Sequence, residues 1–257
     1  MGRRFGFLWL VAVCTAGPAR AVDLPAELDW SRRAALAVPV TGVVREVAVR
    51  PGQRVAKGDL LVALDDRLPV ARLAQAEAAL RQARNDRAEA RRELDRALKM
   101  FEQTLLSEHE RQEAEIAAAA AEAAYQRAHL ALTAAQLMLE YSHLRAPFAG
   151  IVVEVRVLAG ETVVSALKAS PLVILADDQQ MVAVARVTAE QARRWPVGTS
   201  ARVTVGGEWY DGKVIQAGLE PLAGDAKPPH YALSVVFQRP AERDLRAGEA
   251  GEVHIGE

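Results

Sequence analysis

Few residues in this chain have the types and spacing that catalysis or metal binding requires. The histidines lie far apart, without the spacing of zinc ligands, and the only cysteine, Cys14, has no histidine near it. The four methionines are also scattered, so no soft-metal site is indicated. There is no G-x-S-x-G motif, phosphate-binding glycine loop or dinucleotide fingerprint. The histidines, which we expect to be surface or packing residues, are His109, His129, His143, His230 and His254. We therefore predict that the protein is not an enzyme and has no catalytic residue, metal site or bound cofactor.

Two glutamates at matching positions are the one pair that could suggest acid–base catalysis. Glu46 and Glu154 occupy the same place in two copies of a repeated element, which begin at Gly42 and Gly150. A structural position that occurs once in each copy explains this symmetry more simply than a catalytic pair does. We therefore assign both glutamates a structural role.

The repeated element predicts two halves of one β-domain. In each copy a run of β-branched residues leads into a glycine turn, at Gly52 in the first copy and Gly160 in the second. All matching residues of the two copies are separated by one constant offset. Neither copy could bury its apolar face alone, so we expect residues 39–67 and 144–177 to pair into one small β-sandwich.

Between the two copies, residues 68–143 predict a long helical hairpin. No glycine occurs from Pro69 to Tyr141, and apolar residues repeat every seven positions, as they do in coiled coils. The repeat changes register between Thr104 and Glu110, where we place the turn. Ser107 and Glu110 form a capping-box motif for the returning helix. Two antiparallel helices of about 35 residues would project roughly 50 Å.

The seven-residue repeats also predict which residues form the seam between the two helices. The first seam contains Leu73, Ala76, Leu80, Ala83, Ala90, Leu94, Ala97 and Phe101, and Arg87 interrupts it. The second contains Ile116, Ala120, Ala123, Leu130, Ala134, Leu137 and Tyr141, and Arg127 interrupts it. The charged residues outside these seams are expected to form solvated faces.

Residues 178–257 predict a small β-barrel, because several short strands follow one another with glycine and proline turns between them. The expected strands are Met181–Val187, Ala201–Val205, Tyr210–Gln216, Ala232–Phe237 and Glu252–Ile255, with a short helix at Ala189–Trp195. Aromatic residues make up only 5% of the chain, which fits small modules better than one large core. The net charge of −1 gives no reason to expect a nucleic-acid partner.

The N-terminus predicts export from the cytoplasm. Arg3 and Arg4 precede an apolar run and an Ala19-Arg20-Ala21 site, which is the pattern of a cleavable signal peptide over residues 1–21. The run is shorter than the roughly 20 residues that span a bilayer, although an uncleaved anchor is an alternative. Lipid attachment at Cys14 is a further alternative. Residues 22–38 are expected to form a lead-in to the first half of the sandwich.

This order of elements resembles the HlyD-like family of periplasmic adaptors, or membrane fusion proteins, which includes the adaptors of RND efflux transporters. The resemblance covers nearly everything after the signal segment. It implies an elongated multidomain α+β protein: a split lipoyl-like β-sandwich interrupted by an antiparallel coiled-coil hairpin and followed by a small β-barrel. The chain ends soon after its last predicted strand, so we expect no evident membrane-proximal domain.

The resemblance also implies a partner-binding site at the hairpin tip. The family carries an arginine, a leucine four residues later and a serine seven residues after that, and these contact the outer-membrane channel. Arg96, Met100 and Ser107 match this spacing, with methionine in place of leucine. Methionine keeps the volume and apolar character of leucine, so we assign channel binding to these three residues.

The resemblance implies a ring of several copies in the periplasm, held at the inner membrane by a transporter partner. That transporter is expected to be a proton-driven pump of the RND type, with an ATP-driven ABC exporter as the alternative. A third alternative is a lipoyl or biotinyl carrier subunit of an enzyme, because carrier domains share the half-motif. Carrier domains present the modified lysine where this chain inserts its hairpin, so we expect no covalent cofactor.

Overall fold

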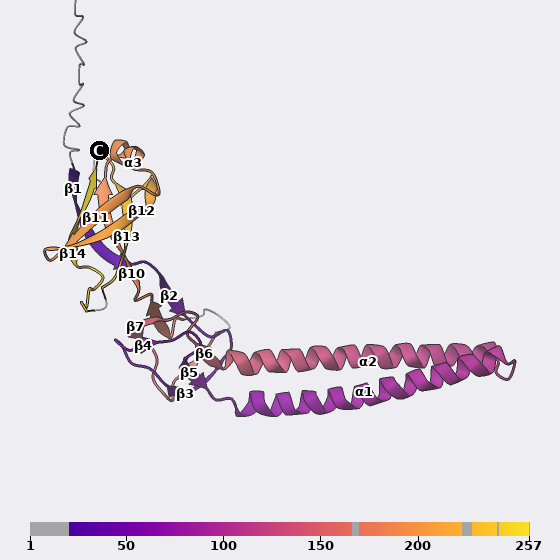
Figure 1. Cartoon of the computed structure of the whole chain (residues 1–257). Coiled ribbons are helices and arrows are strands. Elements are labelled where there is room, and N and C mark those ends of the chain that lie inside the picture. Colours follow the sequence, from indigo (N-terminus) through magenta and orange to yellow (C-terminus); the bar gives the residue numbers. More distant parts are fainter. Residues whose placement is uncertain (1–20, 166–169, 223–227, 241, 257) are drawn as a thin grey trace, which may run out of the picture. The chain divides into compact units, whose positions relative to one another are not determined.

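The computed structural model describes residues 21–165, 170–222, 228–240 and 242–256, which fall into two compact units (Figure 1). One unit spans residues 32–177. The other unit combines residues before Arg32 with residues from Asp178 onward. The predicted signal segment and Cys14 lie outside the described residues, except for Ala21, which begins the first strand.

The sandwich of the first unit consists of two four-stranded sheets, and each sheet takes strands from both copies of the repeat. Their strand orders are β2-β9-β7-β4 and β6-β5-β3-β8. The strands are β2 (Arg33–Leu36), β3 (Gly42–Val47), β4 (Arg54–Val55), β5 (Leu60–Leu64), β6 (His143–Arg145), β7 (Gly150–Val155), β8 (Thr162–Val163) and β9 (Val173–Ala176). Because β3 pairs with β8 and β4 with β7, the sheets form only when both copies are present.

Equivalent backbone hydrogen bonds join the two copies in both directions. The amide of Gly52 donates to the carbonyl of Val152 at 2.8 Å, and the amide of Gly160 donates to the carbonyl of Val44 at 2.8 Å. Gly52 and Gly160 both have positive φ, of 84° and 92°, which glycine adopts without steric cost. The sequence repeat is therefore also a repeat of backbone conformation and pairing.

The core of the sandwich uses matching residues from the two copies. Val44 and Val152 are buried, and so are Val55 and its counterpart Val163. The rest of this core includes Val49, Leu61, Val62, Leu64, Phe148, Val157, Leu172, Val173 and Leu175. Most of these residues are β-branched or leucine, which suits a half-buried pleated surface.

The hairpin consists of α1 (Arg67–Glu102) and α2 (Glu108–Tyr141), joined by residues 103–107 (Figure 1). The predicted seam of α1 is confirmed except at Phe101, which is 37% exposed. Ala76, Ala83 and Ala97 are buried, and the leucines between them are half-buried. Arg87, which interrupts this seam, lies with its guanidinium 3.8 Å from the centre of the Tyr125 ring. Its Nη1 is also 3.5 Å from Glu122, so the charged group is accommodated between the helices.

The predicted seam of α2 is wrong. Ile116 and Leu130 are each 69% exposed, and Leu137 is 40% exposed. Ala120, Ala123, Ala134 and Tyr141 are exposed as well. The residues of α2 that face α1 form a different seven-residue series. They are Arg111, Ala114, Ala118, Ala121, Tyr125, Ala128, Leu132, Ala135 and Leu139. Two series with the same period occupy α2, and the predicted seam was the series with the larger residues.

The second unit is a closed antiparallel barrel with the strand order β1-β10-β13-β12-β11-β14. Its strands are β1 (Ala21–Trp30), β10 (Gln180–Val187), β11 (Ser200–Val205), β12 (Glu208–Pro221), β13 (Tyr231–Gln238) and β14 (Ala250–Gly256). Its short helix is α3 (Ala189–Arg194), which Thr188 caps. The five strands predicted in residues 178–257 correspond to β10 through β14.

Strand β1 was not expected as part of the barrel. The predicted lead-in, residues 22–38, contains β1 and β2, which belong to different units. Strand β1 pairs with β14 on one side and β10 on the other, so it closes the barrel. Its buried residues Leu24, Ala26 and Leu28 alternate with exposed charged residues, a pattern of period two that the sequence displays. Pro25 interrupts this pattern, and proline normally argues against an internal strand.

The barrel interior is filled mainly by aliphatic side chains, together with one buried tryptophan. Trp195, at the end of α3, is only 2% exposed and packs in this core. The other core residues include Leu28, Met181, Val203, Leu233, Val235, Phe237, Leu245, Val253 and Ile255. Among the described residues, none of the helices is both long enough and apolar enough to cross a lipid bilayer.

Candidate partner-binding site at the hairpin tip

The turn at the hairpin tip is a tight helix-ending motif. The amide of Leu105 donates to the carbonyl of Met100, and the amide of Thr104 donates to the carbonyl of Phe101, each at 2.9 Å. These are the two hydrogen bonds of a Schellman motif. Thr104 occupies the position that usually holds glycine, with φ of 62°. A β-branched residue is strained in this conformation, so the surrounding contacts must hold the turn in place.

Ser107 begins α2 and completes a capping box, as its sequence motif predicts. Its Oγ accepts from the amide of Glu110 at 3.3 Å, and its own amide donates to Glu110 Oε2 at 2.9 Å. The Ser107 hydroxyl also donates to Glu110 Oε2 at 2.6 Å. Because its hydroxyl proton is already used within the cap, Ser107 would contact a partner mainly through the remaining lone pair of its oxygen.

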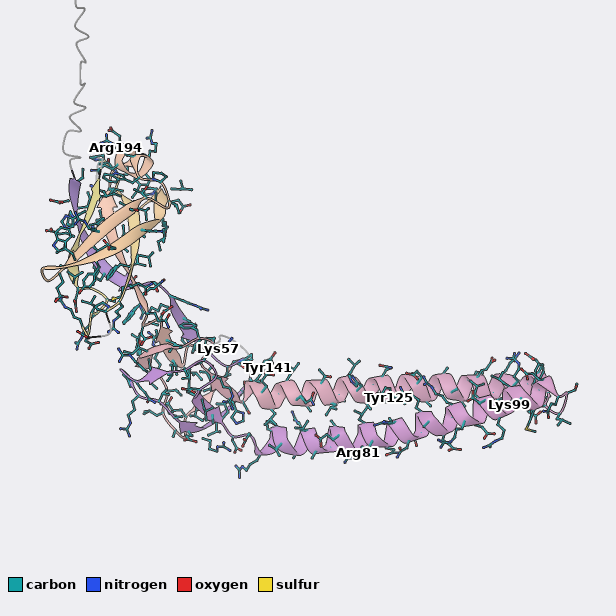
Figure 2. The ribbon with its side chains drawn as sticks, viewed as in Figure 1. Lys57, Arg81, Lys99, Tyr125, Tyr141 and Arg194 are labelled. Atoms are coloured by element: carbon teal, nitrogen blue, oxygen red, sulfur yellow. The ribbon has the colours of Figure 1, made fainter. Side chains whose placement is uncertain are left out.

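Arg96 and Met100 lie one turn apart near the end of α1. The side chain of Arg96 is 61% exposed and forms an ion pair with Glu93. Met100 is 37% exposed. In the described residues no side-chain hydrogen bond or ion pair joins Arg96, Met100 or Ser107 to one another. All three residues are exposed near the end of the hairpin that Lys99 marks in Figure 2.

The tip also exposes apolar residues that the sequence analysis did not assign to the site. Leu105 is 67% exposed, and Leu98 and Phe101 are each more than one third exposed. Leu105 follows the strained Thr104 and projects from the turn rather than from a helix seam. The local sequence Thr104-Leu-Leu, apolar residues directly before the Ser107 cap, was the available signal for this feature. Together with Met100 these residues supply apolar area that a partner protein could bury.

Charge pairs at the start of α2 stabilise the tip. The guanidinium of Arg111 hydrogen-bonds Glu108 and lowers the pKa of that carboxyl to about 2, with a smaller contribution from Gln112. The bonds from Ser107 lower the pKa of Glu110 in the same way. Arg111 also lies 5.4 Å from the centre of the Phe101 ring on α1. Acidic residues in the first turn also suit the positive end of the helix dipole.

We expect Ser107→Ala to lower the stability of the hairpin by about 1 kcal/mol at neutral pH, because an uncapped helix loses one of its few terminal hydrogen bonds. Glu108 and Glu110 have lower pKa values in the folded chain than in the unfolded chain. The contribution of Glu108 is therefore complete at neutral pH and is lost as the pH falls from about 4.5 towards about 2. The contribution of Glu110 is lost in the same direction, as the pH falls below 4.5. Thermal melting followed by circular dichroism at 222 nm, repeated across this pH range, measures both effects.

Thr133→Ala is the matched control for this prediction. Thr133 is an exposed residue of α2 whose hydroxyl donates only to the carbonyl of His129 in its own helix. The control should melt like the wild type at every pH. If Ser107→Ala also melts like the wild type at neutral pH, the capping box does not stabilise the tip.

The remaining residues that could have carried chemistry are dispersed in the structure. Within the described ranges, no group of three or more possible metal ligands comes together. Glu46 lies on β3 and Glu154 on β7, in different sheets. Glu154 forms an ion pair with Arg156 at 2.8 Å. The two glutamates thus occupy equivalent strands of a pseudo-symmetric sandwich rather than one cleft.

Residues 32–177 match the family described as CzcB-like, barrel-sandwich hybrid domain. Among curated proteins, none matches the chain in sequence. Several solved structures share the fold at low identity. A MacA–MexA chimera that contains the Pseudomonas aeruginosa MexA α-hairpin domain is 22% identical, with a TM-score of 0.70 over 93% of this chain and 81% of the chimera.

Two further structures extend this likeness. MacA from Actinobacillus actinomycetemcomitans is 19% identical, with a TM-score of 0.73 over 93% of this chain and 79% of that protein. The membrane fusion protein Spr0693 from Streptococcus pneumoniae R6 is 17% identical, with a TM-score of 0.70 over 92% of this chain and 99% of that protein. At these identities the structures establish a shared fold.

Proposed function

Because the chain belongs to the CzcB-like family of periplasmic adaptors, or membrane fusion proteins, we propose that it links an inner-membrane transporter to an outer-membrane channel. Family members are non-enzymatic adaptors of tripartite efflux pumps. The observation that carries the proposal is the hairpin: helices of 36 and 34 residues whose tip exposes apolar side chains. At 1.5 Å per residue such helices reach roughly 50 Å from the sandwich.

We propose that the transporter partner is a proton-driven pump of the RND type, as the family resemblance implies. An ATP-driven exporter is the alternative partner for the same architecture. The test is a pull-down of the protein, with a C-terminal affinity tag, from its native envelope after detergent extraction. Mass spectrometry identifies the proteins that are recovered with it. A proton-driven transporter recovered with a channel supports the proposal. If an ATP-binding exporter is recovered instead, the adaptor function stands but the energy source is ATP. If neither a transporter nor a channel is recovered, the result contradicts the adaptor function.

The hairpin tip is proposed as the surface that contacts the channel. We expect the double variant Arg96→Ala with Ser107→Asp to reduce channel co-purification by about tenfold or more, the effect of losing a central interface residue. Aspartate is as good an N-cap as serine, so the helices should remain folded. Unchanged circular dichroism together with weakened channel recovery is the expected result.

Arg92→Ala is the matched control for the tip variant. Arg92 is an equally exposed arginine of α1, one turn farther from the tip, and it pairs with Glu89 on its own helix. Channel recovery with this variant should equal that of the wild type. If the tip variant also recovers the channel at the wild-type level, the proposed tip contact is wrong.

A further inference from the structure

A cavity of about 550 Å³ lies at the base of the hairpin, at the opposite end from the tip. It is lined by β3, β5, the start of α1 and the end of α2, which Tyr141 marks in Figure 2. Its apolar lining includes Val43 from the sandwich, Leu68 from α1 and Met138 from α2. These three residues are 44%, 59% and 46% exposed. Large apolar residues that stay exposed around a concave surface indicate a binding site.

A groove between the two helices continues from this cavity. It measures about 450 Å³ and shares Arg72 and Met138 with the cavity, so the two spaces adjoin. The groove is open because most of its lining side chains end at Cβ. Its other lining residues are Gln75, Ala76, Ala79, Ala131, Ala134 and Ala135. The cavity and the groove, together called the base groove, extend along α1 from Leu68 to Ala79, which corresponds to roughly 16 Å.

Contacts between the sandwich and both helices hold the walls of the base groove in place. The amide of Leu64 on β5 donates to the carbonyl of Ser142 at 2.8 Å, which ties the sandwich to the end of α2. Asp66 precedes α1, and its Oδ1 lies 2.5 Å from Nη1 of Arg45 on β3. The other oxygen of Asp66 lies 3.5 Å from Nε2 of His143. The base groove is therefore largely preformed, as small-molecule sites usually are.

Arg72 supplies a positive charge to the base groove that no carboxylate neutralises. It has no ion-pair partner within the described part of the chain. Arg67 also lines the cavity, but its Nη2 lies 2.5 Å from Oδ2 of Asp65. The hydrogen bonds from Arg67 lower the pKa of Asp65 to about 2, so this pair stays charged on both sides. A negatively charged group in the base groove is therefore attracted to Arg72.

We propose that the base groove binds a single-chain anionic amphiphile, such as a medium-chain carboxylate. The carboxylate pairs with Arg72, and the alkyl chain lies between the helices over Ala79 and Ala134. A mostly apolar lining with few polar groups is typical of small-molecule sites. Met138 contacts both parts of the space, and its flexible side chain adapts to ligands of different shape. The proposal goes beyond the adaptor function and does not depend on it.

Isothermal titration calorimetry of the purified full-length protein with sodium decanoate, kept below its micelle concentration, measures this binding. We expect one molecule to bind to each chain. Decyltrimethylammonium has the same chain and the opposite charge, and it should bind at least about threefold more weakly because Arg72 repels it. A protein that does not bind decanoate, or that binds the two amphiphiles equally, overturns the proposal.

Ala134→Phe fills the groove, and Ala120→Phe is the matched control. Both alanines are exposed on the same side of α2, but Ala120 does not line the base groove. We expect Ala134→Phe to bind decanoate at least about tenfold more weakly than the wild type. Ala120→Phe should bind it like the wild type, and circular dichroism at 222 nm should be the same for all three. If Ala134→Phe binds decanoate normally, the ligand does not lie in the groove and the proposal is wrong.

Arg72→Gln tests the charged end of the site, and Arg81→Gln is the matched control. Arg81, labelled on α1 in Figure 2, is also exposed and has no ion-pair partner among the described residues, but it does not line the base groove. We expect Arg72→Gln to weaken decanoate binding by about three- to tenfold and to remove the preference for decanoate over decyltrimethylammonium. Arg81→Gln should change neither. A preference that survives in Arg72→Gln contradicts the proposed role of Arg72.

Two other occupants of the base groove would give different results. If the protein sediments with vesicles of phosphatidylglycerol in a way that Ala134→Phe abolishes, but does not bind decanoate, the apolar lining contacts a membrane and the proposal is wrong. If the affinity for decanoate falls as the protein concentration rises, a second copy covers the base groove, which also overturns it. All these measurements use the isolated protein, so their failure leaves the recovery of membrane partners, and with it the proposed function, unchanged.

Discussion

Gly150→Ala should destabilise the sandwich by more than about 3 kcal/mol, at or above the upper end of the usual cost of overpacking a core. A Cβ at this position would lie 2.1 Å from the carbonyl oxygen of Ala176 and 3.0 Å from its carbonyl carbon. Both atoms belong to the backbone of β9, which is paired with β7. Relief of this overlap requires the two strands to separate, so the penalty includes lost pairing.

Gly42→Ala is the matched control because Gly42 is the equivalent residue in the first copy. There the nearest atom to an added Cβ is Leu64 Cδ1, at 3.2 Å. The end of a leucine side chain can shift by a few tenths of an ångström, so we expect a cost of about 1 kcal/mol or less. The two equivalent glycines of the repeat therefore differ in the space that is available for an added Cβ.

Hydrogen exchange measured by mass spectrometry resolves this prediction by segment. Peptides from β7 and β9 should lose protection in Gly150→Ala and keep it in Gly42→Ala. The fluorescence of the described tryptophans, Trp30, Trp195 and Trp209, reports only on the barrel unit. It should be unchanged in both variants. Equal protection of β7 in the two variants would show that the close contact with Ala176 does not limit this position.

Trp195→Ala should lower the free energy of unfolding of the barrel by about 3–5 kcal/mol, the usual cost of removing a large aromatic side chain from a core. Trp195 is 2% exposed and lies where α3 ends on the barrel. No smaller rearrangement fills the volume of an indole ring, because the surrounding strands form a closed barrel. Urea unfolding followed by the fluorescence of Trp30 and Trp209 measures the change.

Trp195→Phe separates the packing of Trp195 from its polar group. The indole Nε1 is buried and has no hydrogen-bond partner among the described residues. Phenylalanine keeps most of the apolar contact and removes a buried donor that is not satisfied. We therefore expect a loss of only about 1–2 kcal/mol. If Trp195→Ala unfolds at the same urea concentration as the wild type, Trp195 is not an essential part of the barrel core.

The family and the fold class expected from the sequence are confirmed. The repeat was informative because both copies keep the same glycines and valines, and the turn glycines Gly52 and Gly160 both have positive φ in the structure. The capping box at Ser107 was also readable, because it depends on residues only three positions apart. The roles of Arg96, Met100 and Ser107 in channel binding stay a prediction.

Two features could not be predicted from local pattern. The heptad series in α2 indicates the period of the helix but not which of its faces packs against α1. The series with the larger residues, Ile116 and Leu130, faces away from α1. Close packing of α1 and α2 instead uses alanines such as Ala118 and Ala135, because small residues allow the two helices to approach. Strand β1 was missed because Pro25 obscured its alternation and its partners β10 and β14 lie more than 150 residues away.

The sequence by itself determined the elements whose causes are local: two matching β-halves, two long helices, the cap between them and the strands of the barrel. Only the tertiary structure decided which face of α2 turns inward, how the two copies exchange strands and which strand closes the barrel. The physical reason is that periodicity, turns and caps depend on neighbours within a few residues. The inward face of α2, the exchange of strands between the two copies and the closure of the barrel depend on contacts between distant segments. At such contacts the best total packing selects among patterns that look alike locally.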